Sequence, residues 1–509
     1  MSFLERILGT KPSISPRDVD PDALSVLRRL QSQGYTAYLV GGGVRDLLLG
    51  RTPKDFDVAT DARPNQIKKL FRNAYVIGRR FRLVLIRFGE KQIETATFRR
   101  DPGAEDDAPA APAVPAGAAA ERDGALYQDS DNVFGTPEED ALRRDFTVNA
   151  LFWDPATGEI IDYTGGLKDL RRKVLRCIGD PAVRFREDPV RMLRAIRLGS
   201  RLGFSIHADS LAAIRRYGSE IAAASKPRLF EEVLRLFTFA RSREAFGRLH
   251  ETGLLRELLP AVADYVERTG GGRSPFWRWL EALDAVAPEL DTEHRESPRY
   301  VQENALRLAT LLGPLLRERL HAPGAPSARE IVPDLVRDVV VAPYLTGGWR
   351  VPRALCYDLE RILVSLAEYP KRDLRRRGTF SQPWFFTALT LWGVAADAER
   401  DRAAEPALAH WRSQFAAWAD GPHPPRRGTY VPTDPDKAGA RGFPGDVPED
   451  RDSLFPQDRL RGRPRPQPAP GAAAEGEAPA AEDGAEPRKR RRRHRGGRRH
   501  RRRREGEGA

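Results

Sequence analysis

The chain has few of the residues that staple small or metal-dependent folds together. Its 509 residues include two cysteines, Cys177 and Cys356, which lie far apart in the sequence and form no CxxC pair. The eight histidines do not cluster at metal-ligand spacing either. This scarcity argues against a disulfide framework and against a zinc site.

Long apolar runs are also missing. No stretch is long enough to span a bilayer, and the first residues, Met1–Arg6, contain no signal-peptide apolar run. We therefore expect a protein of the reducing cytoplasm with no membrane partner.

The net charge of +13 comes from one terminal block. Thirteen Lys and Arg and no acidic residue lie between Arg488 and Arg504, which leaves 72 basic and 72 acidic residues elsewhere. Blocks of like charge are typically disordered and often bind nucleic acid. A solubilising segment without a fixed partner is the simpler interpretation, and an acidic protein partner is a further one. The candidate RNA contacts in this block are Arg488, Arg490, Arg491, Arg492 and Arg493.

Composition and periodicity divide the chain into regions. Residues 1–20 indicate an irregular leader, and residues 21–168 mix amphipathic helices with short apolar strands around a Pro/Ala-rich, mobile insertion at 101–121. Helical spacing then predominates through 169–240 and 241–420, and residues 421–509 are rich in Pro, Gly and charge. These patterns predict an α+β part with a small sheet, a long all-α part and a disordered end.

Two aspartates, Asp55 and Asp57, carry the first indication of chemistry. Phe56–Ala59 has the pattern of a strand, on which residues two apart share a face. Two neighbouring carboxylates repel each other unless a cation or an arginine neutralises them. They fit a magnesium site for phosphoryl or nucleotidyl transfer, whereas a solvated edge strand or a salt-bridged pair is the structural alternative.

A glycine-rich turn precedes this pair. The sequence Gly41-Gly42-Gly43 follows a predicted strand at 35–40 and opens a predicted helix at 44–49. Glycines let a phosphate approach the backbone, and Arg45 offers a forked set of donors. By itself, this pattern is more often a purely structural turn.

A two-metal site usually requires a further carboxylate. The residues in reach of such a role are Glu94, Asp140 and Asp145. Asp145 follows Arg143-Arg144 where a helical pattern passes into a strand, so Arg144 could hold phosphate or ribose. A charge cluster at a helix end explains the same tripeptide without any ligand.

A row of charged residues follows on one predicted helix, 188–201. Asp188, Arg191, Arg194 and Arg197 recur at steps of three and so share a slowly drifting face. Ion pairing within the helix is one explanation. Base recognition is the other: a carboxylate that accepts from an exocyclic amine and an arginine that donates to a ring nitrogen would accept adenine or cytosine and reject guanine or uracil.

Taken in order, these segments resemble a known family, the class II nucleotidyltransferases, which comprise CCA-adding tRNA nucleotidyltransferases and bacterial poly(A) polymerases. The resemblance covers residues 35–205 through the segments LVGGGVRDLLLG, KDFDVAT, IETATFRR, EEDALRRDFTVNAL, DYTGGLKDLRRKVLR and FREDPVRMLRAIRLGSRLGF. It implies a nucleotidyltransferase head (21–168), a helical neck that binds RNA and nucleotide (169–240) and a helical body with a C-terminal domain (241–420).

The resemblance also implies roles for individual residues. The catalytic carboxylates and ligands of two Mg²⁺ ions would be Asp55, Asp57 and Asp145. Gly42, Arg45 and Arg144 would contact the nucleotide. Asp188 and Arg191 would read the base, with support from Arg194 and Arg197.

The segment Gly78–Leu83 indicates which member of the family this is. With the preceding Val76 and Ile77 it resembles the sequence that distinguishes bacterial poly(A) polymerases, and its Arg79 and Arg80 would contact RNA unless they are a solvated loop pair. The resemblance predicts an enzyme that adds AMP from ATP to RNA 3′ ends, with RNA-decay proteins as possible partners of the basic end. A CCA-adding enzyme is the near alternative, and a non-catalytic RNA-binding protein is a remote one.

Overall fold

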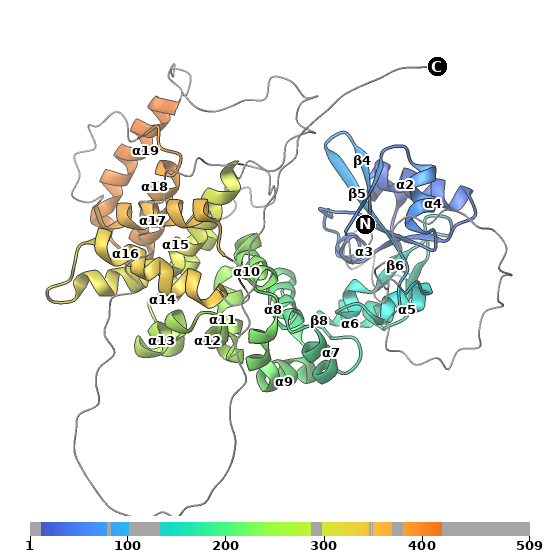
Figure 1. Ribbon diagram of the computed structural model, residues 1–509, viewed down its shortest axis with the longest axis horizontal. Coiled ribbons are helices and arrows are strands. Elements are labelled where there is room, and N and C mark those ends of the chain that lie inside the picture. Colours follow the sequence, from blue (N-terminus) through green and yellow to red (C-terminus); the bar gives the residue numbers. More distant parts are fainter. Residues whose placement is uncertain are drawn as a thin grey trace, which may run out of the picture. The chain divides into compact units, whose positions relative to one another are not determined.

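The computed structural model of the protein describes residues 12–78, 83–100, 133–286, 298–345, 348, 350–368 and 380–419 (Figure 1). Arg79, Arg80, the insertion at 101–121 and the whole basic end therefore lie outside the described residues. The described residues all belong to the first of two units, which ends at Pro422.

A seven-stranded mixed sheet forms the centre of the N-terminal region. Its order is β3-β4-β5-β2-β1-β6-β7, and the β2–β5 pair is parallel whereas the other pairs are antiparallel. The strands are β1 (Ala37–Val40), β2 (Asp57–Thr60), β3 (Ala74–Ile77), β4 (Leu83–Phe88), β5 (Lys91–Thr97), β6 (Leu151–Trp153) and β7 (Ile160–Asp162).

The two faces of this sheet are covered differently. Helices α2 (Pro21–Ser32) and α4 (Pro64–Leu70) place a buried apolar stripe, which includes Val26, Leu30 and Ile67, in the main core on one face. A smaller buried cluster covers part of the other face, and it consists of Val40, Ala59, Phe98, Ala141, Ala150, Phe152 and Ile178. Asp57, the first residue of β2, pairs with Val40 of this smaller cluster and is only partly buried, so the cluster does not cover that end of the face completely.

Three local predictions from the sequence differ from the structure. Helix α3 (Gly42–Leu48) begins within the glycines themselves, and a 3₁₀ turn (Thr147–Asn149) separates α5 (Pro137–Leu142) from β6 where the helical pattern was expected to pass directly into a strand. Asp188 is not helical: it has φ −140° and ψ 90° and separates α7 (Pro181–Glu187) from α8 (Val190–Leu202). Pro189 explains this break, because a residue before proline is driven out of the α region.

The rest of the described chain is helical, apart from the short parallel pair of β8 (Val174–Leu175) and β9 (Ser205–Ile206). These helices are α5 (Pro137–Leu142), α6 (Gly166–Arg172), α9 (Ala208–Tyr217), α10 (Lys226–Arg235), α11 (Ser242–Thr252), α12 (Leu254–Leu258), α13 (Pro260–Arg268), α14 (Phe276–Val286), α15 (Pro298–His321), α16 (Ala328–Val336), α17 (Arg353–Glu368), α18 (Phe385–Glu399) and α19 (Glu405–Ala419). The predicted fold class, a small mixed sheet followed by helices, is confirmed within the described ranges.

Candidate active site

Three carboxylates gather at the open face of the sheet. Asp57 begins β2, and the β2–β5 register, which pairs Val58 with Thr95, places Asp57 next to Glu94 on the same face. Asp55 lies just before the strand rather than on it, and its charge acts on both Asp57 and Glu94. The structure therefore brings Glu94 to the predicted Asp55–Asp57 pair.

The electrostatics of this cluster are those of a site with an excess of negative charge. Burial, followed by the charges of Glu94 and Asp55, raises the pKa of Asp57 from 3.8 to about 6, against the opposing effect of Arg144. Burial and the Asp55 charge also raise the pKa of Glu94. A bound cation would relieve this repulsion.

The donor set fits Mg²⁺. Carboxylate oxygens are the ligands that this hard cation prefers, and it commonly binds through one or two carboxylates together with substrate phosphates and water. Within the ranges that the structure describes, no three His, Cys, Asp or Glu side chains already stand close enough to hold an ion by themselves. A site in which protein carboxylates and phosphate oxygens share the ion fits both the carboxylate donors and the lack of three close protein ligands.

The glycine turn closes over this cluster at Gly41. Its φ is +75°, and a side chain here would meet Arg144 Nη1 at 3.1 Å and Asp57 Oδ2 at 3.8 Å. Glycine is thus required both by the conformation and by the close approach. Arg144 itself donates to Asp140 through Nη2 (2.9 Å) and to the carbonyl of Asn149 (3.3 Å).

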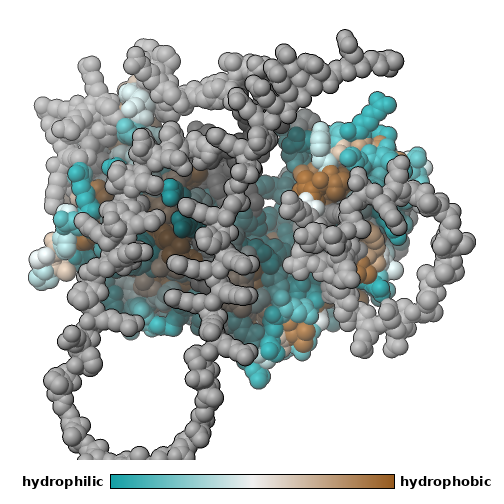
Figure 2. Space-filling view, in the orientation of Figure 1, coloured by the Kyte–Doolittle hydropathy of each residue, from teal (hydrophilic) through white to brown (hydrophobic). Residues whose placement is uncertain are grey.

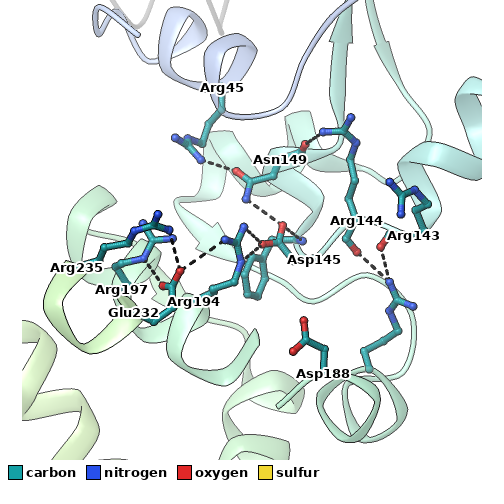
Figure 3. A network of polar contacts seen from close by, with 12 residues as sticks. Arg45, Arg143, Arg144, Asp145, Asn149, Asp188, Arg194, Arg197, Glu232 and Arg235 are labelled. Atoms are coloured by element: carbon teal, nitrogen blue, oxygen red, sulfur yellow. Dashed lines mark hydrogen bonds and ion pairs between the residues drawn. The ribbon is translucent and has the colours of Figure 1, made fainter. Parts of the chain in front are cut away.

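Asp145 does not join the carboxylate cluster. Its Oδ2 accepts from Arg194 Nε (2.8 Å) and Nη2 (2.6 Å), and its Oδ1 accepts from the Phe146 backbone N–H and the Asn149 amide (Figure 3). Burial alone would raise the pKa of Asp145, but Arg194 and these hydrogen bonds hold it below its usual value. Its contacts in the structure are those of a structural link between the sheet region and α8.

Arg194 and Arg197 share an acidic partner, Glu232 of α10, which is the second one for Arg194 after Asp145. Arg197 Nε donates to Glu232 Oε2 at 2.7 Å, Arg235 Nη1 donates to Oε1 at 3.1 Å, and Arg194 Nη1 lies 3.9 Å from Oε1. Glu232 is only 4% exposed, so it needs these cations. The partners of Arg194 and Arg197 thus lie on other elements, so ion pairing within the helix does not explain these two arginines.

Arg45 is buried inside the same network. Its guanidinium donates to the side-chain oxygen of Asn149 and pairs with Asp46 at 2.7 Å, and Arg201 Nη2 of α8 binds the other Asp46 oxygen at 3.2 Å. Only 3% of Arg45 is exposed. Arg45 therefore braces the glycine turn against α8, and Gly42, the first residue of α3, packs against its guanidinium.

The predicted base-reading pair lies at the α7–α8 junction. Both oxygens of Asp188 accept from Arg228 of α10, at 3.1 Å and 2.8 Å, and this pair is partly exposed. Arg191 donates to the carbonyl of Arg184 (3.1 Å) and pairs with Glu187 (3.4 Å). The carboxylate and the guanidinium that would read a base are thus three residues apart in the chain, and each has another partner.

Residues that sequence reasoning did not assign hold this arrangement together. Asn149 connects Arg45, Arg144 and Asp145 (Figure 3). On α10, Arg228 and Glu232, four residues apart, hold Asp188 and the α8 arginines. The four-residue spacing of Arg228 and Glu232 puts them on one helix face. That spacing was readable from the sequence, whereas their partners on other elements were not.

Comparisons with known proteins show which families this chain is similar to. Residues 37–176 match the family described as poly A polymerase head domain, and residues 203–266 match a family described as the probable RNA and SrmB-binding site of polymerase A. Poly(A) polymerase I of Salmonella typhi is 35% identical over 440 residues, which cover 84% of this chain and 89% of that protein.

Enzymes of a related activity are similar over shorter stretches. The CCA-adding enzyme of Geobacillus thermodenitrificans is 36% identical over 262 residues, 52% of this chain and 60% of that protein. The crystal structure of the Bacillus stearothermophilus CCA-adding enzyme in complex with CTP superposes with a TM-score of 0.54 at 28% identity, and the match covers 78% of this chain and 83% of that one.

One further observation concerns the helices. Among those in the described part of the chain, none combines the length and the apolar character that crossing a membrane requires.

Proposed function

The chain belongs to the poly(A) polymerase family of nucleotidyltransferases, and from this premise we propose that it adds AMP from ATP to RNA 3′ ends without a template. The observation that carries the proposal is the cluster of Asp55, Asp57 and Glu94 on the open face of the sheet, together with similarity to poly(A) polymerase I over most of both chains.

In this reaction the 3′-hydroxyl of the RNA attacks the α-phosphorus of ATP. The new bond joins O3′ to the α-phosphorus, the bond from that phosphorus to the α–β bridging oxygen breaks, the hydroxyl proton is lost to solvent, and pyrophosphate leaves. Asp55, Asp57 and Glu94 would hold Mg²⁺ ions, two in this proposal. Bound Mg²⁺ supplies charge neutralisation for the triphosphate and lowers the pKa of a coordinated hydroxyl.

The remaining site residues would position the nucleotide. Arg144, beside Asp57 and partly exposed, would contact a phosphate or the ribose. Asp188 would accept from the N6 amine of adenine and Arg191 would donate to N1, while Arg194 and Arg197 hold α8 against Asp145 and Glu232. Asp145, which the family resemblance counted among the metal ligands, would act here by fixing Arg194.

A second candidate function is CCA addition, because the Asp188–Arg191 pair has the chemistry to accept both adenine and cytosine, and because CCA-adding enzymes are among the similar proteins. We propose RNA as the macromolecular substrate of either reaction, bound in part by residues 203–266, with the cytoplasm as the location. RNA-decay proteins are candidate partners of the basic C-terminal block.

The carboxylate assignment is tested by single substitutions. Asp57→Asn and Glu94→Gln should each lower kcat for AMP incorporation into an RNA primer by two orders of magnitude or more, since each removes a ligand of a shared cation. Glu90→Gln, in the exposed β4–β5 turn, is the matched control and should leave kcat unchanged. If either site variant kept the wild-type kcat, the substituted residue would not be a ligand of the shared cation.

A further inference from the structure

An exposed apolar strip lies at the β3–β4 end of the sheet. It consists of Tyr75, Ile77, Leu83 and Leu85, and we call it the β3–β4 strip. Tyr75 is 54% and Ile77 42% exposed, while Leu83 and Leu85 are half-buried. Figure 2 shows hydrophobic surface where β4 and β5 lie in Figure 1. Contiguous exposed apolar residues of this kind usually mark a binding site.

The strand register makes the strip continuous with the carboxylate cluster. Tyr75 pairs with Leu85 and Ile77 with Leu83, and Leu85 pairs in turn with Glu94 of β5. Paired residues point to the same side of a sheet, so the strip and Glu94 share one face. With strands about 4.8 Å apart, Asp57 of β2 lies about 10 Å from β4 and about 15 Å from β3.

We propose that the β3–β4 strip is the stacking platform for the base of the RNA's 3′-terminal nucleotide, an inference that rests on the AMP transfer proposed above. The 3′-hydroxyl must reach the carboxylate cluster, so the base of the same nucleotide lies no farther from the cluster than roughly the length of one nucleotide. The surface next to the cluster on the β4 side of this face is the apolar and aromatic β3–β4 strip. Sheet-borne aromatic side chains are a common platform for unstacked RNA bases, because every base has a π-face.

The charge around the strip supports RNA as the occupant. The guanidinium of Arg87, on β4, lies over one face of the Tyr75 ring, 5.4 Å from its centre, which leaves the other face for a base and lets the guanidinium meet a backbone phosphate. Strands β3 and β4 contain no Asp or Glu, although the neighbouring Glu94 side is acidic. Arg87 therefore attracts the RNA backbone at the β3–β4 strip. Near Glu94 the RNA must bind together with a cation, because the carboxylates repel its phosphates.

The test compares two protein variants with two primers. One primer is a fluorescent 12-nucleotide oligo(A), and the other is the same oligonucleotide with an abasic 3′-terminal nucleotide. Kd is measured by anisotropy and KM by AMP incorporation, for wild type, Tyr75→Ser and Tyr75→Phe. Tyr357→Ser is the matched control, since Tyr357 is 49% exposed and carries Arg361 5.1 Å over its ring, on a different part of the chain.

Tyr75→Ser should weaken binding of the intact primer by roughly tenfold, the usual effect of losing one stacked base, with the ATP KM unchanged. The abasic primer should bind wild type about tenfold more weakly and should bind Tyr75→Ser with no further loss. Tyr75→Phe should recover most of the affinity. The salt dependence of Kd should be the same in all variants, because stacking releases no counterions.

Two results would overturn the proposal. The first is a Tyr75→Ser protein that binds the intact primer as tightly as wild type, or whose loss simply adds to the abasic loss. The second is a change of oligomeric mass in Tyr75→Ser by light scattering, which would make the strip a contact between copies of the chain. Failure of the wild type to extend either primer with ATP would instead refute the proposed function. Failure of the stacking proposal and failure of the proposed function are thus distinguishable.

Discussion

The link between Asp145 and Arg194 permits a prediction that separates a positioning role from a catalytic one. Asp145→Ala would leave the Arg194 guanidinium with the more distant carboxylate of Glu232, 3.9 Å away. Removing one member of a buried ion pair typically costs 3–5 kcal/mol, and because Arg194 keeps a third of its side-chain surface exposed, we expect about 3 kcal/mol. The free energy of unfolding should fall by that amount at pH 7.5.

A double-mutant cycle measures the link directly. Arg194→Ala removes the cation that Asp145 needs, and the double variant Asp145→Ala/Arg194→Ala leaves neither charge unpaired. The two single losses should therefore exceed the loss of the double variant by about 2 kcal/mol. The assay is urea denaturation followed by circular dichroism, with Asp334→Ala as a control for an exposed pair, which should cost under about 1 kcal/mol.

The pH dependence of this effect has a definite sign. Because the folded state lowers the pKa of Asp145 below 3.8, its contribution is fully present above the unfolded pKa and is lost as the pH falls through the folded value. The wild type should thus lose its advantage over Asp145→Ala only in strongly acidic solution. If Asp145→Ala were as stable as wild type at pH 7.5 and lost only transfer activity, Asp145 would be a metal ligand and the reasoning would be refuted.

Three further predictions concern the carboxylates, the base and the basic end. In EDTA at pH 8, Asp57→Asn should be more stable than wild type by up to about 3 kcal/mol, since the raised pKa of about 6 means that ionised Asp57 opposes folding. In urea titrations this gain in the free energy of unfolding should disappear below pH 4, and no gain at pH 8 would contradict the prediction. Asp188→Ala should lower the preference for ATP over GTP by roughly tenfold in competition assays, because the acceptor for the N6 amine is lost, and an unchanged preference would exclude Asp188 as a base reader. Truncation after Gly484 should weaken RNA binding and flatten its salt dependence without changing the ATP KM, whereas an unchanged salt slope would show that the basic block makes no RNA contact.

The elements that the sequence predicted well are those with local determinants. The helix at Pro21–Ser32 has an Asp20 cap, a proline at its start and a regular apolar stripe, and all of these are readable from consecutive residues. The mixed sheet itself was also predictable, because short apolar runs alternate with turns. Asp188 shows where local reading fails, since a three-residue charge period suggested helix and Pro189 broke it.

The candidate site was only partly readable for a different reason. Asp55 and Asp57 could be paired from their spacing, but Glu94, Asp140 and Asp145 were all candidates for the third carboxylate, and the family resemblance favoured Asp145. The position of Glu94 beside Asp57 depends on the parallel pairing of β2 with β5, which no local pattern specifies. In the same way, Arg194 binds Asp145, which is 49 residues away, and Arg197 binds Glu232, which is 35 residues away.

The most direct test of the account is the product made from ATP or CTP on two RNAs, a tRNA that lacks its 3′ end and an unrelated primer. We predict long A tracts on both RNAs with ATP alone and little incorporation of CTP. A reaction that uses both nucleotides, extends only the tRNA and stops after CCA would contradict the proposed poly(A) synthesis.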